Sequence, residues 1–468
     1  MAREALAGRE AWLVGGTVRD RLLGAPEKAD IDLIVPDDPE QAARAIARAT
    51  RAPAFELSGE FGNWRVVGGR DDGEPWQIDV AALQGGSLEE DLARRDFTVN
   101  AMAEPLAGGG IVDPHGGRED LAARRLRMVS AEAFDSDPLR LIRLVRFACT
   151  LDLEPEPETL AAARARAARI DAVARERVFA ELRQIIASDR VRDGIRLLDE
   201  IDLTSHVLPE LAALRGVEQN RYHHLDVYEH TLAVLDAVVE IESDPGAPLE
   251  MPELSGPLRE FLARPLADEM TRGTALRFGA LLHDIAKPQT QARDEDGNVL
   301  GFPRHDVEGA KVSRAVLAGL RASERLRAHV EALARHHLRL GFLVHEMPLD
   351  RRDIYRYITA TRPVEVDVSL LSVADRLATR ERKAEEAIAR HMEAARAVLP
   401  AALRFEEEAG GPPLVRGDEL ARALGIKPGP ELGRLLAAID EARYVGEVAT
   451  PDEAVALARR LLAADGGG

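Results

Sequence analysis

A glycine pair near the N-terminus carries residue types suited to phosphate chemistry. An apolar run ending at Val14 predicts a strand, Gly15 and Gly16 predict a turn, and the stretch through Arg19 predicts the opening of a helix. Backbone N–H groups at such a turn can point at phosphate oxygens, and residues without a Cβ let those oxygens come close. The segment could therefore hold a triphosphate, although a glycine pair alone more often marks an ordinary turn.

Acidic residues follow at the spacing that a strand requires. Asp30 and Asp32 lie two apart, in and beside the strand-like run at 31–35, so both carboxylates should project from one face. Asp79 lies in another strand-like run at 77–80 and could complete a trio. Hard oxygen ligands on one face can hold Mg²⁺, so Asp30 and Asp32 are predicted catalytic carboxylates. The alternative is that each is a solvated carboxylate at a strand end.

Further segments, in a fixed order, make the pattern specific. They span residues 94–103, 113–117, 137–148 and 176–178. With the first segments they resemble the signature of the polymerase-β-like nucleotidyltransferases, in particular the class II tRNA nucleotidyltransferases (CCA-adding enzymes) and the bacterial poly(A) polymerases. The resemblance implies transfer of nucleotides to an RNA 3′ end with the help of Mg²⁺. It also implies that Asp79 is the third catalytic carboxylate, because the family carries an acidic residue on such a strand. The nucleotide-binding residues predicted on this basis are Gly15, Gly16, Arg19, Arg95, Asp96, Asn100, Asp137 and Arg140.

Asp137 and Arg140 are the predicted readers of the nucleotide base. They lie three apart, so on a helix they would share a face. A carboxylate accepts from the exocyclic amine of cytosine or adenine, and a guanidinium donates to ring acceptors, so side chains could replace a template base. The family's usual pattern begins Glu-Asp, whereas Ser136 precedes Asp137 here. This difference from the family pattern bears on how the two base-reading residues are positioned, since both of them are present.

The connection after the third predicted strand is short. Only residues 81–86 separate it from the helical segment that begins at Ser87. Family members that add a complete CCA end usually carry a longer, flexible and partly basic segment there, which is associated with switching from CTP to ATP. The shortening resembles the CC-adding subgroup. The alternative is that another segment performs the switch in this chain.

A second set of residues with metal-ligand chemistry lies further along the chain. Its order resembles an HD-domain phosphohydrolase, in which imidazoles and carboxylates bind transition metals such as Mn, Ni, Fe or Co. The predicted ligands are His230, His283, Asp284, His305, His336 and Asp375. The roles of His223, His224 and His337 stay open at this point. The domain could also persist as a scaffold for RNA without hydrolytic activity.

Composition limits the broad class of the protein. The chain has 468 residues, 46% of them hydrophobic, which predicts several ordinary globular domains. Cys149 is the single cysteine, which excludes an intrachain disulfide. No run approaches the length of a bilayer span, so we predict a cytoplasmic protein without membrane association. The net charge of −19 argues weakly against nucleic acid, but arginines recur between residues 118 and 196 and predict a local positive surface.

The predicted fold class is α+β, with a polymerase-β-like mixed-sheet head followed by all-α RNA-binding and HD domains. The head should span 1–134, a helical nucleotide-selecting and RNA-binding neck 135–215, the HD domain 216–400 and a helical tail 401–468. Strands are expected at 64–67, 77–80 and 110–112, none after residue 135, and linkers near 209–216, 244–257 and 410–413. In the tail, a tight interhelical turn could bring Lys427 to RNA.

The leading hypothesis is a tRNA nucleotidyltransferase that uses CTP, with ATP as a possible second substrate, and acts on the tRNA 3′ end rather than on DNA. CC addition is favoured over full CCA addition, A addition and poly(A) synthesis. A chain that is chiefly a metal phosphohydrolase with an inactive head is the alternative from another class, and a pure RNA-binding protein is weaker still.

Overall fold

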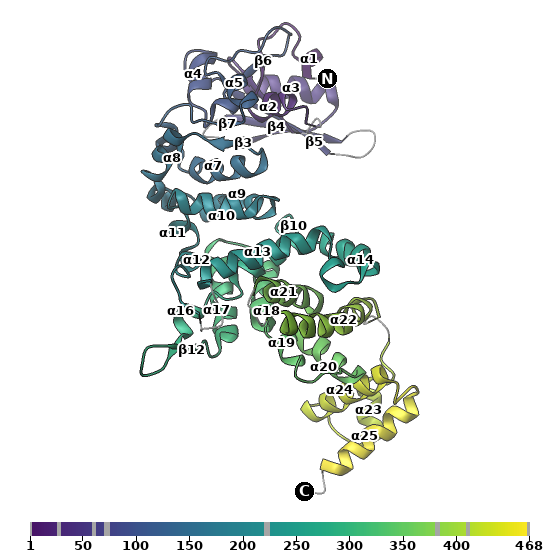
Figure 1. Ribbon diagram of the computed structural model, residues 1–468. Helices are drawn as coiled ribbons and strands as arrows, with labels where there is room; N and C mark the ends of the chain where they lie inside the picture. Colours follow the sequence, from purple (N-terminus) through teal and green to yellow (C-terminus); the bar gives the residue numbers. More distant parts are fainter. Residues whose placement is uncertain are drawn as a thin grey trace. The chain divides into compact units, whose positions relative to one another are not determined.

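The computed structural model describes residues 2–25, 30–58, 62–69, 75–219, 225–379, 384–408 and 412–465. The chain forms two units, Met1–Val207 and Leu208–Gly468 (Figure 1). Their division lies near the predicted boundary at 215/216, and the other predicted domain boundaries stay predictions. Within the described residues, no helix is both long and apolar enough to cross a bilayer.

A six-stranded mixed sheet is the framework of the first unit. Its strand order is β3-β4-β5-β2-β1-β6, with β2 and β5 parallel and the other neighbours antiparallel. The strands are β1 (Trp12–Val14), β2 (Asp30–Val35), β3 (Ala54–Ser58), β4 (Asn63–Gly69), β5 (Pro75–Ala82) and β6 (Ala103–Pro105). The strands expected at 64–67 and 77–80 are thus present as parts of β4 and β5.

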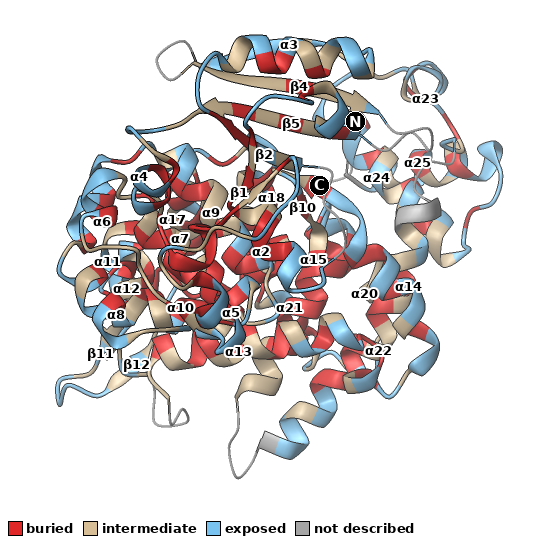
Figure 2. Cartoon of the chain, turned by 90° about the horizontal axis from the view of Figure 1, so that it is seen from above, coloured by how far each residue is buried: buried red, intermediate tan, exposed pale blue. Residues whose placement is uncertain are grey.

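One face of this sheet is buried against helix α3 (Pro39–Thr50). The helix begins where Asp38 accepts a hydrogen bond from the N–H of Gln41, with Pro39 in its first turn. Its residue Ile46 packs in a core with Leu33 and Val80, which alternate along β2 and β5 with residues of the opposite sheet face. Figure 2 shows α3 running beside β4 and β5. The other face carries the predicted carboxylates and also a second, smaller core that contains Ile34, Val14 and Leu92.

Short helices complete the head, and longer ones follow. In Figure 1, α7 (Arg140–Thr150), α9 (Arg175–Ala187) and α10 (Val191–Glu200) stack in succession. The remaining helices of this unit are α1 (Ala2–Ala5), α2 (Gly16–Leu22), α4 (Leu88–Ala93), η1 (Thr98–Asn100), α5 (Gly117–Ala122), α6 (Ala133–Ser136), α8 (Pro157–Arg164), η2 (Ala167–Ala172) and α11 (Thr204–Val207).

The second unit is almost entirely helical. Its first part contains α12 (Pro209–Ala212), α13 (Val227–Ser243), η3 (Ala247–Leu249), α14 (Pro252–Ala263), α15 (Arg272–Leu282), α16 (Lys287–Thr290), α17 (His305–Gly319), α18 (Glu324–His336), α19 (Arg339–Leu343), α20 (Arg351–Thr361), α21 (Glu365–Ala378) and α22 (Ala384–Glu408). The tail contains α23 (Gly417–Leu424), α24 (Pro430–Val445) and α25 (Pro451–Asp465) around a core of their own. The predicted tight turn follows α23, where Gly425 adopts a φ of 68°.

Three expectations about secondary structure are wrong. Residues 110–112 form no strand, because only a single bridge joins Val112 to Ala103. Strands of two or three residues, too short to show an alternating pattern, do occur after residue 135. They are β8 (Glu154–Pro155), which pairs with β7 (Arg125–Leu126), β9 (Pro265–Ala267) with β10 (Met270–Thr271), and β11 (Ala292–Arg293) with β12 (Val299–Gly301). The region 244–257 is not a linker throughout, because Pro252 opens α14 rather than breaking a helix.

Candidate active site and metal-ligand cluster

The glycine turn brings backbone close to two charged side chains. Gly15 adopts a φ of 62° directly before α2, a conformation that residues with a Cβ rarely adopt. A Cβ at Gly15 would lie 3.0 Å from Nη1 of Arg95 and 3.8 Å from Oδ2 of Asp32. A side chain here would therefore fill the space between a cation and a carboxylate.

The predicted carboxylates lie where the alternation of β2 and β5 places them. Asp30 and Asp32 share the sheet face opposite α3, and Asp32 stands directly beside Asp79 across the parallel strand pair. The pKa of Asp32 is raised by its enclosure in the mouth of a hollow, although part of the side chain stays exposed, and by the charges of Asp79 and Asp30. Arg95 acts in the opposite direction. A divalent cation such as Mg²⁺ would relieve the repulsion among these carboxylates.

Asp79 has an additional partner that the sequence did not indicate. Both of its oxygens accept hydrogen bonds from Arg65, at 2.7 Å from Nε and 2.7 Å from Nη2. Arg65 lies opposite Asp79 in the β4–β5 pairing. The third predicted carboxylate is thus half of a bidentate ion pair, and a metal ion would share it with Arg65.

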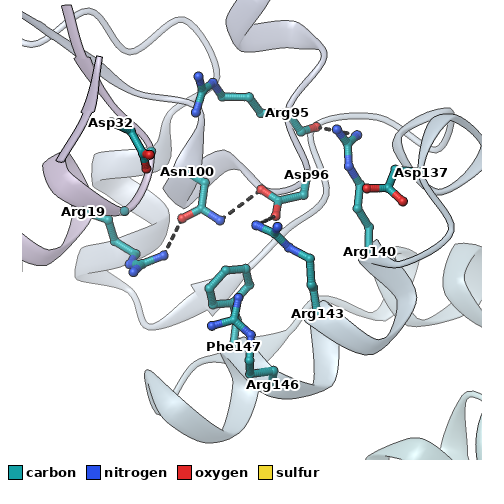
Figure 3. A pocket seen from close by; sticks show the side chains of 12 residues that line it. Arg19, Asp32, Arg95, Asp96, Asn100, Asp137, Arg140, Arg143, Arg146 and Phe147 are labelled. Carbon is teal, nitrogen blue, oxygen red and sulfur yellow. Dashed lines mark hydrogen bonds and ion pairs between the residues drawn. The ribbon is translucent and has the colours of Figure 1, made fainter. Parts of the chain in front are cut away.

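All eight predicted nucleotide-binding residues line one hollow, together with Asp32 (Figure 3). Three further residues of α7 line it as well, namely Arg143, Arg146 and Phe147. Their spacing after Arg140 is the signal that could have assigned them, because residues three or four apart on a helix share a face. The hollow is therefore rich in guanidinium groups, which suits a triphosphate.

A chain of hydrogen bonds fixes the floor of this hollow, as Figure 3 shows. Arg19 donates to Oδ1 of Asn100 at 2.6 Å, and Nδ2 of Asn100 donates to Asp96 at 3.0 Å. Asp96 also pairs with Arg143 at 2.6 Å. Burial opposes ionisation of Asp96, but Arg143 and the hydrogen bond from Asn100 outweigh it and lower the pKa of its carboxyl. Asp96 therefore holds Asn100 and Arg143 in place.

The two predicted base readers do not share a helix face, so that expectation is wrong. Asp137 is extended, with a φ of −143°, between α6 and α7, and Arg140 is the first residue of α7. Pro138 explains the break, because the residue before a proline is disfavoured in helical conformation. Asp137 accepts from Nη2 of Arg177 at 3.2 Å, and Arg140 donates to the carbonyl oxygen of Arg94 at 2.8 Å. Both nevertheless line the hollow.

The predicted local positive surface is reduced by pairing. Arg127 and Arg143 are bound to carboxylates, and Arg166 and Arg169 both pair with Asp135. Pairing with carboxylates therefore offsets part of the charge of the arginines between 118 and 196.

Histidines and carboxylates of the second unit gather into a buried cluster. Five of the predicted ligands belong to it: His230 on α13, His283 and Asp284 after α15, His305 at the start of α17, and Asp375 on α21. His337 joins them after α18, with Nε2 at 3.3 Å from Nε2 of His305 and 3.9 Å from Oδ1 of Asp284. Two groups within it, His230 with His283 and Asp284, and Asp284 with His305 and His337, have the spacing of metal ligands.

The histidine rings of this cluster are oriented by the backbone. Nδ1 of His283, His305 and His337 each lies 2.7–2.8 Å from the carbonyl oxygen three residues earlier. Since Nδ1 then carries the proton, each Nε2 presents a lone pair to the cluster. Nε2 of His283 is buried and lies 3.1 Å from Oδ2 of Asp284. Lone pairs that converge in this way fit a metal ion.

Charges inside the cluster point the same way. Burial opposes ionisation of Asp284, but His283 and Lys287 outweigh it and hold the pKa of its carboxyl well below the usual range. Burial together with the neighbouring His283 lowers the pKa of His337 to about 4. Asp284 is therefore ionised and His337 neutral at pH 7, as metal binding requires. For His283, burial opposes protonation, but the neighbouring Asp284 outweighs it and raises the pKa of the ring.

His336, which was predicted as a ligand, does not belong to this cluster. Its Nδ1 accepts a hydrogen bond from Arg339 at 3.0 Å, whereas the next residue, His337, lies inside. Neighbouring residues at a helix end point in different directions, so only one of an adjacent pair can enter the site. His223 and His224 lie outside the described residues.

Comparisons with known proteins follow this geometry along the chain. Residues 11–127 match the family model described as the poly A polymerase head domain. Residues 152–214 match the probable RNA and SrmB binding site of polymerase A, and residues 227–380 match the HD domain. Fold and site together thus define a nucleotidyltransferase head joined to an HD domain.

Two relatives are similar over nearly the whole chain. An A-adding tRNA nucleotidyltransferase of Deinococcus radiodurans is 38% identical over 96% of this chain and 95% of its own. A CC-adding tRNA nucleotidyltransferase of Thermus thermophilus is 35% identical over 95% and 92%. The chain belongs to the tRNA nucleotidyltransferase family, enzymes that add nucleotides to RNA 3′ ends without a template, which confirms the resemblance.

Solved structures confirm the fold. A CCA-adding enzyme in complex with ATP has a TM-score of 0.65 at 19% identity, covering 99% of this chain and 94% of that one. The Thermotoga maritima CCA-adding enzyme complexed with tRNA has a TM-score of 0.62 at 19% identity, covering 98% and 94%. The α+β head followed by helical domains is therefore the arrangement that the sequence predicted.

Proposed function

We propose that this enzyme adds cytidines from CTP to the tRNA 3′ end and stops before the final adenosine. The observation that supports this most directly is the connection between β5 and α4. The N–H of Gln84 donates to Asp91 at 2.9 Å, and that of Gly86 donates to Glu90 at 2.7 Å. Ser87 in turn caps α4 by accepting from Glu90 at 3.2 Å. A connection this short and this tied to α4 cannot reach over to reshape the nucleotide hollow.

Sequence identity does not choose between the two specificities. The A-adding relative and the CC-adding relative match over almost the same length, at 38% and 35% identity. The hydrogen-bonded connection is the feature of this chain that favours CC addition. The cytoplasmic location stays a prediction.

The reaction assigns roles to the residues of the first unit. Asp30, Asp32 and Asp79 would hold Mg²⁺, which lowers the pKa of the RNA 3′-hydroxyl and neutralises charge on the transferred phosphate and pyrophosphate. Arg19 and Arg95 bind the triphosphate, with Arg19 oriented by Asn100.

Base choice falls to Asp137 and Arg140. An oxygen of Asp137 accepts from the exocyclic amine of cytosine, and Arg140 donates to the acceptor atoms of the ring. Arg140 donates hydrogen bonds to the carbonyl oxygens of Arg94 and Arg95, at 2.8 and 3.3 Å. These bonds hold the guanidinium plane of Arg140 in a fixed orientation relative to the phosphate-binding segment.

The experiment that tests the specificity compares three tRNA transcripts, ending at the discriminator base, at the first C and at CC. We expect two cytidines on the transcript that ends at the discriminator base and one on the transcript that ends at the first C. We expect no adenosine on the transcript that ends at CC, even with ATP in excess, because the hollow is not remodelled. Single-turnover incorporation of labelled nucleotide provides the measurement. Adenosine addition to the CC transcript at a rate comparable to cytidine addition would refute the proposal.

Replacing Arg140 should weaken base choice more than triphosphate binding. In Arg140→Ala we expect the ratio of kcat/KM for CTP to that for UTP to fall about tenfold, since a good side-chain pair with a base edge supplies roughly 1–3 kcal/mol of discrimination. Arg169→Ala is the matched control, because Arg169 pairs with Asp135 and does not line the hollow. Equal losses for CTP and UTP would contradict the role in base choice.

We propose a second activity for the HD domain, the metal-dependent hydrolysis of a phosphoester. His230, His283, Asp284, His305, His337 and Asp375 would hold transition-metal ions such as Mn, Ni, Fe or Co, which supply an activated water when bound. The converging Nε2 atoms carry this proposal, because a scaffold would not need rings whose lone pairs face one another at 3.3 Å.

A further inference from the structure

The sheet face that carries the carboxylates extends beyond them as a continuous row of side chains. Across the strand pairs, Asp32 stands opposite Asp79, Asp79 opposite Arg65, and Arg65 opposite Phe55 on β3. Directly opposed residues project from the same face of a sheet. The row therefore leads from the predicted metal-binding carboxylates to β3, the edge strand of the sheet.

The edge end of this row is apolar and open. Phe55 is 45% exposed and Leu57 is 42% exposed, two residues apart on the same strand. Ala54, their neighbour on the opposite face, packs toward the α3 core. Glu56, between Phe55 and Leu57, is also exposed, so what distinguishes the carboxylate face here is a large aromatic ring that the described residues leave nearly half exposed.

A second hollow begins where the nucleotide hollow ends. Both are lined by Asp32 and Arg95, and the second continues to Leu57 on β3 and to Asn63 on β4. The remaining residues that line it are Val14, Leu33, Ile34, Asp79, Val80, Ala81, Ala82, Gln84 and Asp91. The first hollow is dominated by guanidinium groups and suits a triphosphate, whereas the second offers amides, aliphatic groups and carboxylates. A reaction that joins two substrates needs two such hollows meeting at one catalytic group.

We propose that this second hollow and the Phe55 end of the row bind the single-stranded 3′ end of the RNA substrate. The terminal ribose occupies the hollow, with its 3′-hydroxyl at Asp32, and an upstream base stacks on Phe55 beside Leu57. Phe55 lies three strand spacings from Asp32, roughly 14 Å, so the stacked base precedes the reacting nucleotide. The inference rests on the proposed role of Asp32 at the reaction centre.

The chemistry of the row fits RNA at each step. Exposed aromatic rings bind unpaired bases by stacking, without requiring a particular base. Arg65 lies between Phe55 and the carboxylates, and its ion pair offsets the charge of Asp79, which would otherwise repel the RNA backbone. The exposed apolar area is limited to two side chains. It therefore matches a single base stacked on one ring rather than a large flat partner.

The test uses the full-length protein, a tRNA transcript ending at the discriminator base, and CTP. In Phe55→Ala we expect the KM for tRNA to rise about tenfold, equivalent to about 1.4 kcal/mol, while kcat and the KM for CTP change by less than about twofold. Phe55→Trp should restore the KM for tRNA, because it restores a stacking surface. Phe342→Ala is the matched control, since Phe342 is another exposed phenylalanine among the described residues and lies in the second unit.

Each outcome decides the inference. An unchanged KM for tRNA in Phe55→Ala, an equal rise in the KM for CTP, or failure of Phe55→Trp to rescue would overturn it. If Phe55→Ala changes the molecular mass measured by light scattering and leaves both KM values unchanged, this edge instead contacts a second copy of the chain. If the catalytic assignment of Asp32 is wrong, Asp32→Ala will remain active, whatever the behaviour of Phe55→Ala. The failure of the catalytic assignment can therefore be told apart from the failure of this inference.

Discussion

Replacing Asp32 by alanine should reduce cytidine addition by at least roughly a thousandfold, the loss expected when several kcal/mol of transition-state stabilisation are removed. Asp32 lines both hollows and stands beside Asp79, so no other carboxylate can take its place between the two substrates. Single-turnover incorporation of labelled CTP provides the measurement. Asp37→Ala is the matched control, because Asp37 is exposed just beyond the end of β2.

The same substitution makes a second, independent forecast about stability. The pKa of Asp32 is raised in the folded protein, so at neutral pH its ionised form is less favourable there than in the unfolded chain. Asp32→Ala should therefore not lower the Tm measured in the presence of EDTA. Activity within about tenfold of the parent protein would refute the catalytic role, and a large loss of Tm would show that Asp32 is structural.

Replacing His283 should remove metal from the second unit and abolish phosphoester hydrolysis. We expect His283→Ala to lose bound Mn, Ni or Co and any hydrolysis of bis(p-nitrophenyl) phosphate or a 2′,3′-cyclic nucleotide, because it removes a buried nitrogen that lies at metal-ligand spacing from His230 and Asp284. Cytidine addition should stay within about twofold of the parent value, since the two chemistries use different ligand sets. Metal content by mass spectrometry and hydrolysis rates are the measurements.

Two further variants protect this test. Asp284→Asn preserves the volume of a buried side chain and should give the same losses, whereas His345→Ala, at an exposed position outside the cluster, should give neither. If the parent protein binds no transition metal when dialysed against Mn, Ni, Fe and Co, the domain is a scaffold and the hydrolytic proposal is wrong.

The sequence predicted best the features that depend on local periodicity. Asp30 and Asp32 share a face because side chains alternate along a strand, and Gly15 occupies a turn because only glycine tolerates its backbone there. The order of the motifs, through the family resemblance, also predicted the eight nucleotide-binding residues. No local pattern could show that they would all line one hollow, because that depends on how α7 packs beneath the sheet.

Features set by packing at one position were missed. Nothing in the sequence joins Arg65 to Asp79, because their contact follows from the register of β4 and β5. His337 rather than His336 enters the cluster because of the direction in which α18 ends. The break before α7 could have been predicted from the sequence, since Pro138 restricts the conformation of Asp137. The prediction of a shared helix face did not take this restriction into account.

The hydrogen bonds that hold residues 84–87 to α4 have a thermodynamic consequence. A segment that must be ordered during each catalytic cycle adds its lost conformational entropy to the barrier, at about 1–2 kcal/mol for each residue whose backbone is fixed. This segment is already ordered before substrates arrive, so that entropy does not enter. The first and the second cytidine additions should then share one activation entropy, and the length of the product would be set by the fixed dimensions of the hollow.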